Sequence, residues 1–193
     1  MNGRALFLMD YEAGICGPQG MAGAEVARRE VLPRAKRCLR AARDAKMNIY
    51  HIRVAFDEQY SLRTNRSKRF TGMQERGALL LGSPDAAICE DVAPIPGEPI
   101  ITKGCVNPFI GTALVELLIG ERIGELYLGG VATNFVVEST LRHAVDSGFR
   151  VTVIEDICAS FSREMHDFAI TNIFPAFAEL CSADEFITAA ANA

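Results

Sequence analysis

A strand, a tight turn and a helix are encoded in Gly129-Gly130-Val131-Ala132-Thr133-Asn134-Phe135-Val136-Val137-Glu138-Ser139-Thr140. The apolar run at residues 125–130 predicts a buried strand, and residues 135–147 have the pattern of a helix. A glycine-rich turn between two such elements offers free backbone N–H groups and a helix N-terminus, which stabilise a developing negative charge. The segment therefore predicts a site for an anion at the end of a strand.

Apolar runs and helical patterns alternate along the whole chain, with no internal repeat and no low-complexity stretch. This alternation is typical of βαβ units and predicts an α/β fold around a parallel sheet. The expected strands are residues 6–10, 48–56, 99–103, 125–130, 151–156 and 180–182. The expected helices are residues 31–46, 112–119, 135–147 and 163–180, with a last helix from residue 183.

Size and charge limit the class of protein. A chain of 193 residues fits one domain, residues 1–193, with 49% hydrophobic and 23% charged residues, as in ordinary globular proteins. The net charge of -4 argues against nucleic-acid binding and against an anionic membrane surface. No apolar run approaches the roughly 20 residues of a membrane-spanning helix. The chain starts with a strand rather than a signal peptide, so we expect a cytoplasmic protein.

The six cysteines are scattered and have neither CxxC spacing nor histidines grouped with them. This pattern argues against a zinc site and predicts reduced thiols rather than disulfides. They are Cys16, Cys38, Cys89, Cys105, Cys158 and Cys181.

One long region, residues 57–97, has no clear helical or strand pattern, and regions of this length in compact domains are usually functional or mobile. Two interpretations stay open for it: a solvated basic surface loop, or a lid whose arginines bind a carboxylate of the substrate. Its basic residues are Arg63, Arg66, Lys68, Arg69 and Arg76.

Two ionisable residues end predicted strands, Asp10 after Leu6-Phe7-Leu8-Met9 and Lys103 after Pro99-Ile100-Ile101-Thr102. Ligands of parallel sheets bind outside the carboxyl ends of the strands, where the Gly130 turn also lies. A buried aspartate needs a partner, and Lys103 is the candidate. The pair is either a structural ion pair or part of a catalytic site.

Four segments of the chain resemble those of the isochorismatase-like hydrolases, also called cysteine hydrolases. Met9-Asp10-Tyr11-Glu12-Ala13-Gly14 resembles the opening motif of the family, in which Gln is common at the position of Glu12. Lys103 with Asn107-Pro108-Phe109-Ile110-Gly111-Thr112 resembles the lysine segment. Gly130-Val131-Ala132-Thr133 matches the turn with a non-prolyl cis peptide, and Glu155-Asp156 with Cys158-Ala159 fits the fifth strand and its loop.

The resemblance covers nearly the whole chain and implies a three-layer, Rossmann-like sandwich with a six-stranded, mostly parallel sheet. It implies a homo-oligomer and a small-molecule substrate, and we expect no cofactor and no metal. Carried over by position, it implies Asp10 as general acid/base, Lys103 as its electrostatic partner, and the N–H groups of Ala132 and Val136 as the oxyanion site. It also implies a cis bond between Val131 and Ala132. The residues expected to line the substrate pocket are Tyr11, Glu12, His51, Cys105, Phe109 and Asn134.

The chain departs from the family at Val136, which stands where most members have the nucleophilic cysteine, and at Asn134, where Asp is commoner. Valine has no lone pair, so a thioester route cannot run through this position. Three hypotheses remain. The first is hydrolysis without a covalent intermediate, as in the true isochorismatases, which lack the cysteine and protonate a vinyl ether. In the true isochorismatases glycine is usual at the position of Val136, so the larger valine would narrow the pocket.

In the second hypothesis another thiol, from Cys16, Cys105 or Cys158, replaces the missing nucleophile, activated by Lys103. In the third, the protein binds a ligand or assembles without catalysis. Among the histidines, His51 is expected in the core or the pocket wall, and His143 and His166 at helix surfaces or interfaces. Asp57 is followed by Glu58 and Gln59 rather than by the Asp-x-His of metal-binding members, which argues against a metal.

Overall fold

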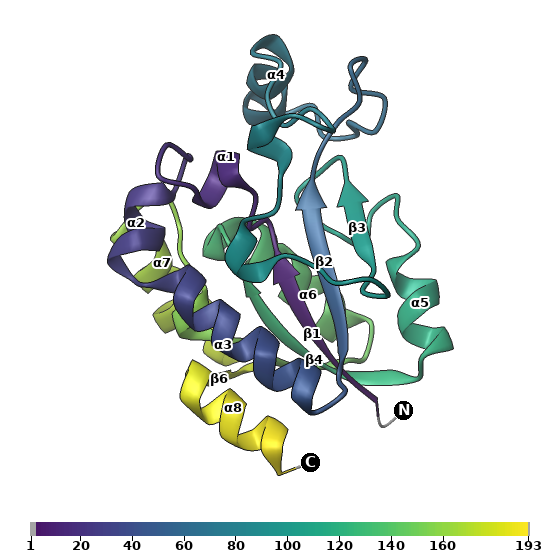
Figure 1. The fold of residues 1–193 in the computed structure, drawn as a ribbon, viewed down its shortest axis with the longest axis vertical. Coiled ribbons are helices and arrows are strands. Elements are labelled where there is room, and N and C mark those ends of the chain that lie inside the picture. Colours follow the sequence, from purple (N-terminus) through teal and green to yellow (C-terminus); the bar gives the residue numbers. More distant parts are fainter. Residues whose placement is uncertain (1–2, 193) are drawn as a thin grey trace.

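A computed structural model describes residues 3–192, which form a six-stranded parallel sheet with the strand order β3-β2-β1-β4-β5-β6 (Figure 1). The expected mostly parallel sheet is confirmed, and every pair of neighbouring strands in it is parallel. The strands are β1 (Gly3–Met9), β2 (Asn48–Val54), β3 (Ile100–Lys103), β4 (Ile123–Gly130), β5 (Arg150–Ile154) and β6 (Glu179–Cys181).

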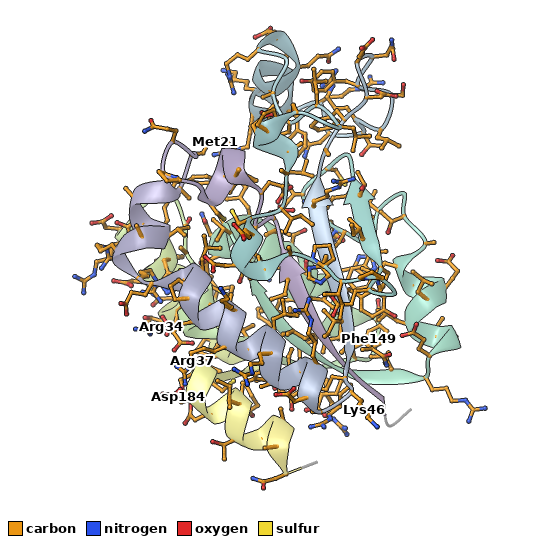
Figure 2. All side chains as sticks on the ribbon, in the orientation of Figure 1. Met21, Arg34, Arg37, Lys46, Phe149 and Asp184 are labelled. Carbon is orange, nitrogen blue, oxygen red and sulfur yellow. The ribbon has the colours of Figure 1, made fainter. Side chains whose placement is uncertain are left out.

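Helices cover both faces of the sheet, which gives the three layers. The α-helices are α1 (Ala13–Cys16), α2 (Gly23–Arg28), α3 (Val31–Asp44), α4 (Lys68–Glu75), α5 (Leu114–Gly120), α6 (Glu138–Asp146), α7 (Arg163–Phe168) and α8 (Ala183–Ala191). One apolar core joins the sheet to α3 and α8, and the other joins it to α5 and α6. Figure 2 shows Arg34 and Arg37 on α3 beside Asp184 of α8, and Arg37 donates a hydrogen bond of 2.5 Å to Asp184.

Strand β1 shows how the sequence produces these layers. Leu6 and Leu8 face the core under α3, whereas Phe7 and Met9 face the core under α6. All four side chains are buried because a parallel sheet between two helical layers is covered on both faces. The continuous apolar run that predicted a buried strand is therefore confirmed.

Two expectations about helices were wrong. Residues 163–180 do not form one helix: α7 continues into a π-helix at Ala169–Ile173 and a 3-10 turn at Phe174–Ala176, and β6 follows. Pro175 lacks the N–H group that an α-helix would need there. Residues 57–97 are not wholly irregular, because α4 and two 3-10 turns, Pro84–Ala86 and Glu90–Val92, lie within them.

The carboxyl ends of β1 and β4 lie side by side, and the strand order changes direction between them. This position is where open α/β sheets bind their ligands. Figure 1 shows α4 beyond the same end of the sheet, on the side to which the arrowheads of β2 and β3 point. Among residues 3–192, none of the helices has both the length and the apolar character that crossing a membrane requires.

Candidate functional site

Asp10 and Lys103 form a buried ion pair although they come from strands that are not neighbours. Lys103 ends β3 and reaches past the end of β2, and its Nζ lies 2.8 Å from Oδ2 of Asp10. Asp10 follows β1 with a left-handed φ of 57°, and its N–H donates to the carbonyl of Ile52 at 2.8 Å. Lys103 also donates to the carbonyl of Cys105 at 3.1 Å. The expected pairing at the carboxyl ends of the strands is confirmed.

The ionisation of Asp10 is set by two opposing effects. Burial raises the pKa of Asp10 above its ordinary value, whereas the charge and the hydrogen bond of Lys103 lower it. The second oxygen of this carboxyl, Oδ1, is buried without a hydrogen-bond partner among the described residues. Because burial favours its protonated form, Asp10 can give and take a proton at a pH nearer to neutral than a solvated aspartate can.

The turn after β4 approaches β1 closely and ends at Val136. A Cβ atom on Gly130 would lie 2.6 Å from the carbonyl oxygen of Met9, so only glycine fits there. The peptide bond between Val131 and Ala132 is cis, as expected. Among the described residues, no acceptor takes the N–H of Ala132. The next five residues, Thr133–Val137, form a π-helix that leads into α6.

A chain of hydrogen bonds fixes this turn from outside the sheet. Oγ1 of Thr133 lies 2.8 Å from Nδ1 of His166, and Nε2 of His166 lies 2.8 Å from Glu155. Arg29 of the segment after α2 also donates to Glu155. The hydrogen bond from His166, together with Arg29, lowers the pKa of Glu155 to about 2. The expectation that His166 lies on a surface was wrong, because only 1% of it is exposed.

Asp10, Lys103, Ala132 and Val136 line one small cavity with a volume of about 40 Å³. A single water molecule needs roughly 10–15 Å³ on the same measure, so the cavity accepts a small polar group or a few waters. Apart from Asp10, Lys103 and Arg69, its walls are apolar. The apolar lining consists of Ile15, Met21, Val54, Phe70, Met73, Val106, Val131, Ala132, Phe135, Val136 and Phe161.

Arg69 of α4 lies between two aromatic rings at this cavity. Its guanidinium carbon is 4.6 Å from the ring centre of Phe135 and 4.3 Å from that of Phe161, both within the range of cation–π contacts. Among the described residues no carboxylate forms an ion pair with it. Burial lowers the pKa of Arg69 from its ordinary value, but an arginine stays charged.

The other basic residues of residues 57–97 do not reach the cavity. Arg66, Lys68 and Arg76 are exposed, and Arg63 donates to the carbonyl of Asn65. The two interpretations of this region therefore apply to different residues: Arg69 fits the substrate-binding hypothesis, whereas three others form a solvated surface.

None of the six expected pocket residues is among the residues that line the cavity. Their side chains are engaged elsewhere. Tyr11 donates to the carbonyl of Ile157, Glu12 accepts from the N–H of Val54, His51 is hydrogen bonded to Glu98, Cys105 donates to the carbonyl of Asn107, Phe109 stacks on His143, and Asn134 accepts from Ser160. For His51 the core interpretation was right, since its exposed fraction is 1%.

The described cysteines are all unpaired, and none lines the cavity. Cys16 donates to the carbonyl of Asp10, and burial raises its pKa well above the usual value for a thiol. Burial likewise raises the pKa of Cys158 to about 12. Both are therefore thiols rather than thiolates at neutral pH. No group of His, Cys, Asp or Glu side chains within residues 3–192 is arranged to hold a metal ion.

Sequence reasoning missed most of the walls of the cavity. Met21, Phe135 and Phe161 are ordinary apolar residues in the sequence, and nothing in their spacing separates them from core residues. Figure 2 labels Met21, which lies on the loop between α1 and α2, at the end of the sheet that carries α4. Arg69 differs from these residues by its positive charge, which suggests a role in binding an anion. The same charge is present on Arg63, Arg66, Lys68 and Arg76, so the sequence does not single out Arg69.

Comparisons with known proteins agree on one family. The family model described as the isochorismatase domain matches residues 4–185. The uncharacterized isochorismatase family protein YwoC of Bacillus subtilis is 29% identical over 184 residues, 95% of this chain and 92% of that one. YecD of Escherichia coli O157:H7, of the same description, is 37% identical over 89 residues, which are 46% of this chain and only 47% of that protein. A cysteine hydrolase structure from Pseudomonas syringae has a TM-score of 0.86, with 22% identity over 98% of this chain and 92% of that one.

Proposed function

Because the chain belongs to the isochorismatase family of hydrolases, we propose that it hydrolyses a small anionic metabolite without a cysteine nucleophile. In this proposal Asp10 donates and accepts the proton, and Lys103 stabilises its charged form. The observation that carries the proposal is the cavity, where Asp10 and Lys103 meet Arg69 and Val136 and where no cysteine is among the lining residues.

The chemistry follows from the two states of Asp10. In the resting pair Asp10 is a carboxylate held by Lys103 at 2.8 Å, and it takes a proton from a water molecule as the water oxygen adds to the substrate carbon. Protonated Asp10 then gives this proton to the leaving group as its bond to the carbon breaks, so the carboxylate is regenerated without a covalent intermediate. The N–H groups of Ala132 and Val136 bind the negative charge that develops on the substrate.

Arg69 supports an anionic substrate. Its guanidinium is held over Phe135 and Phe161, and it has no carboxylate partner among the described residues, so its N–H donors are available to a carboxylate. Arginine binds carboxylates through two parallel hydrogen bonds, which also orient the bound molecule. The cavity is small, so it admits the reacting group while the anionic part lies against Arg69.

Two alternatives remain distinct from this proposal. An amidohydrolase with a relocated thiol would need Cys16, Cys105 or Cys158 at the cavity as a thiolate, and none of them lines it. A retired homologue would keep the cavity for binding alone. The Asp10–Lys103 pair is compatible with that alternative, because a buried ion pair also serves stability.

A hydrolysis screen of small amides, ureas and enol ethers, each with and without a carboxylate, separates the three. We would compare wild type with Asp10→Asn and with a variant in which Cys16, Cys105 and Cys158 are replaced by alanine. The proposal requires turnover that Asp10→Asn abolishes and that the cysteine-free protein retains. Loss in a folded cysteine-free protein would support the relocated thiol. No turnover in any protein, with a compound that still raises the melting temperature, would support a binding homologue.

We also propose that the protein is a homo-oligomer. Large apolar side chains are exposed on α7 and just after the 3-10 turn Phe174–Ala176, with exposed fractions of 45% for Met165, 61% for Phe168 and 38% for Phe177. Side chains of this kind are favoured at protein interfaces. Light scattering coupled to size-exclusion chromatography measures the mass directly, and a mass equal to that of one 21.0 kDa chain would contradict the proposal.

A further inference from the structure

Glu12 is a fully buried acidic residue next to the Asp10–Lys103 pair. It follows β1 two residues after Asp10, and its exposed fraction is 0%. Its Oε1 accepts a hydrogen bond of 2.6 Å from the backbone N–H of Val54 at the end of β2. Its Oε2 is buried and has no hydrogen-bond partner among the described residues. A full carboxylate with one donor for two oxygens is a costly state in the interior of a protein.

The buried cluster around Glu12 contains too few positive charges to balance two carboxylates. The titratable groups that face it are Asp10, Lys103, Cys16 and Cys89. Burial raises the pKa of both thiols, so they are neutral, and Lys103 is the one cation of the group. Its ammonium lies 2.8 Å from Asp10 and is therefore already paired. A second carboxylate would leave a net negative charge in this buried cluster.

We propose that Glu12 is a neutral carboxylic acid that positions the Asp10–Lys103 pair: its proton keeps the cluster at one positive and one negative charge, and its carbonyl oxygen ties the end of β1 to the end of β2. Burial and the neighbouring Asp10 both raise the pKa of Glu12 well above its usual value, in agreement with this assignment. The protonation of Glu12 follows from the structure alone, whereas its relevance to catalysis rests on the proposed function.

The consequence for stability has a definite sign. An unfolded glutamate ionises at a pKa of about 4.3, whereas Glu12 keeps its proton in the folded protein. Between these two pKa values the folded state binds one proton more than the unfolded state, so stability falls as the pH rises. Glu12→Gln replaces the acid with a neutral side chain of the same shape and removes this dependence.

The experiment measures urea unfolding of wild type and Glu12→Gln at pH 5, 6 and 7. The ratio of the unfolding constants, wild type over variant, should rise by up to about tenfold for each pH unit. Glu75→Gln, on an exposed residue of α4, is the matched control and should give a ratio independent of pH. A ratio for Glu12→Gln that is flat or falls with pH would overturn the proposal.

A second measurement tests the charge of Glu12 directly and does not depend on activity or on the unfolding free energy of the variant. Carbon-13 NMR of protein labelled at the Asp and Glu carboxyls should show one glutamate still protonated at neutral pH in wild type. The titration of Asp10, assigned with Asp10→Asn, should be the same in wild type and in Glu12→Gln, because one neutral group replaces another. If every glutamate of wild type is ionised, or if Asp10 titrates at lower pH in Glu12→Gln, Glu12 is charged and the inference is wrong. Neither result depends on whether a substrate is turned over, so the proposed function stands or fails separately.

Discussion

Replacing Lys103 with methionine removes the cation that forms an ion pair with Asp10 and keeps most of the side-chain volume. Both groups are buried, with exposed side-chain fractions of 1% for Lys103 and 9% for Asp10. Removing one partner of a buried pair costs about 3–5 kcal/mol, since the other charge is left uncompensated. With a urea dependence of about 2 kcal/mol per molar, the unfolding midpoint should fall by about 1.5–2.5 M at pH 8.

The loss should depend on pH with a known sign. Without Lys103 the pKa of Asp10 in the folded protein rises further above its unfolded value of about 3.9, because only the effect of burial remains. A raised folded pKa gives stability that is fully present below the unfolded pKa and is lost as the pH rises through the folded pKa. The deficit of the variant should therefore be smaller at pH 4.5, where the unpaired Asp10 of the variant gains its proton more readily, than at pH 8, where this buried carboxyl is charged without a partner.

Urea unfolding followed by far-UV circular dichroism at both pH values measures this deficit. Adding Asp10→Asn to Lys103→Met removes the unpaired charge and should restore part of the stability at pH 8, so the four proteins form a double-mutant cycle. A deficit below about 1 kcal/mol at pH 8, the range of exposed ion pairs, would refute the reasoning. A deficit of equal size at pH 4.5 and 8 would refute it as well, since lost packing alone does not titrate.

Three further predictions concern the cavity. Asp10→Asn should fold and lower kcat by roughly 10²–10⁴-fold, the usual contribution of a general acid, measured on a substrate found by the screen. Arg69→Met should lower kcat/KM by about 10- to 150-fold for a carboxylate substrate, which corresponds to about 1.5–3 kcal/mol for one charged hydrogen bond, and should leave its neutral ester unaffected. Val136→Cys should acquire one iodoacetamide adduct that wild type lacks, detected by mass spectrometry, because Lys103 lowers the pKa of a thiol in this cavity.

These predictions have controls within the chain. Arg66 is exposed and does not line the cavity, so Arg66→Met should leave kcat/KM unchanged for both the carboxylate and its ester. Equal losses in Arg66→Met and Arg69→Met would mean that the general positive charge of the region, rather than one contact, attracts the substrate. Val136→Ala controls for the smaller side chain in the labelling experiment. An unlabelled Val136→Cys protein would show that position 136 is closed to small electrophiles.

The strands and the charged pair were predictable from the sequence for one reason. Buried parallel strands read as continuous apolar runs, and the residues that follow them meet at one edge of the sheet. Asp10 and Lys103 are 93 positions apart in the sequence, and they form the ion pair that this rule predicts. The turn at Gly130 follows from the same rule, since Met9 and Gly130 are paired in the register of β1 and β4.

The region that contains α4 was not predictable, because tertiary contacts determine its path. A Cβ atom on Gly104 would lie 1.7 Å from the carbonyl oxygen of Leu62, so this loop passes directly over the residue after Lys103. The stacking of Tyr60 on Phe56, with 4.6 Å between ring centres, holds the start of the loop. The approach of Leu62 to Gly104 joins segments far apart in the sequence, and no local pattern encodes it. In this arrangement Arg69 lines the cavity, whereas Arg66 does not.

The same argument applies to His166. Its position on a helix predicts no burial, and its burial depends on Thr133 and Glu155, which come from two other segments. A polar side chain in the interior is stable only with such partners, and they lie 33 and 11 residues away in the sequence. Sequence patterns identify the residues at strand ends well and the residues that hold them in place poorly.

The charge balance of the cavity connects the proposed function with the inference about Glu12. With Glu12 neutral, Asp10 and Lys103 cancel, and the guanidinium of Arg69 leaves one positive charge at the cavity. A substrate with a single carboxylate brings the sum to zero, whereas a neutral substrate leaves Arg69 unpaired and a substrate with two carboxylates adds an uncompensated charge. If Glu12 were ionised, the empty site would already be neutral and would have no electrostatic preference for an anion. The protonation state of Glu12 therefore decides whether this site selects monoanions. If Glu12 is protonated, a singly charged substrate should have a higher kcat/KM than its neutral and its doubly charged analogues.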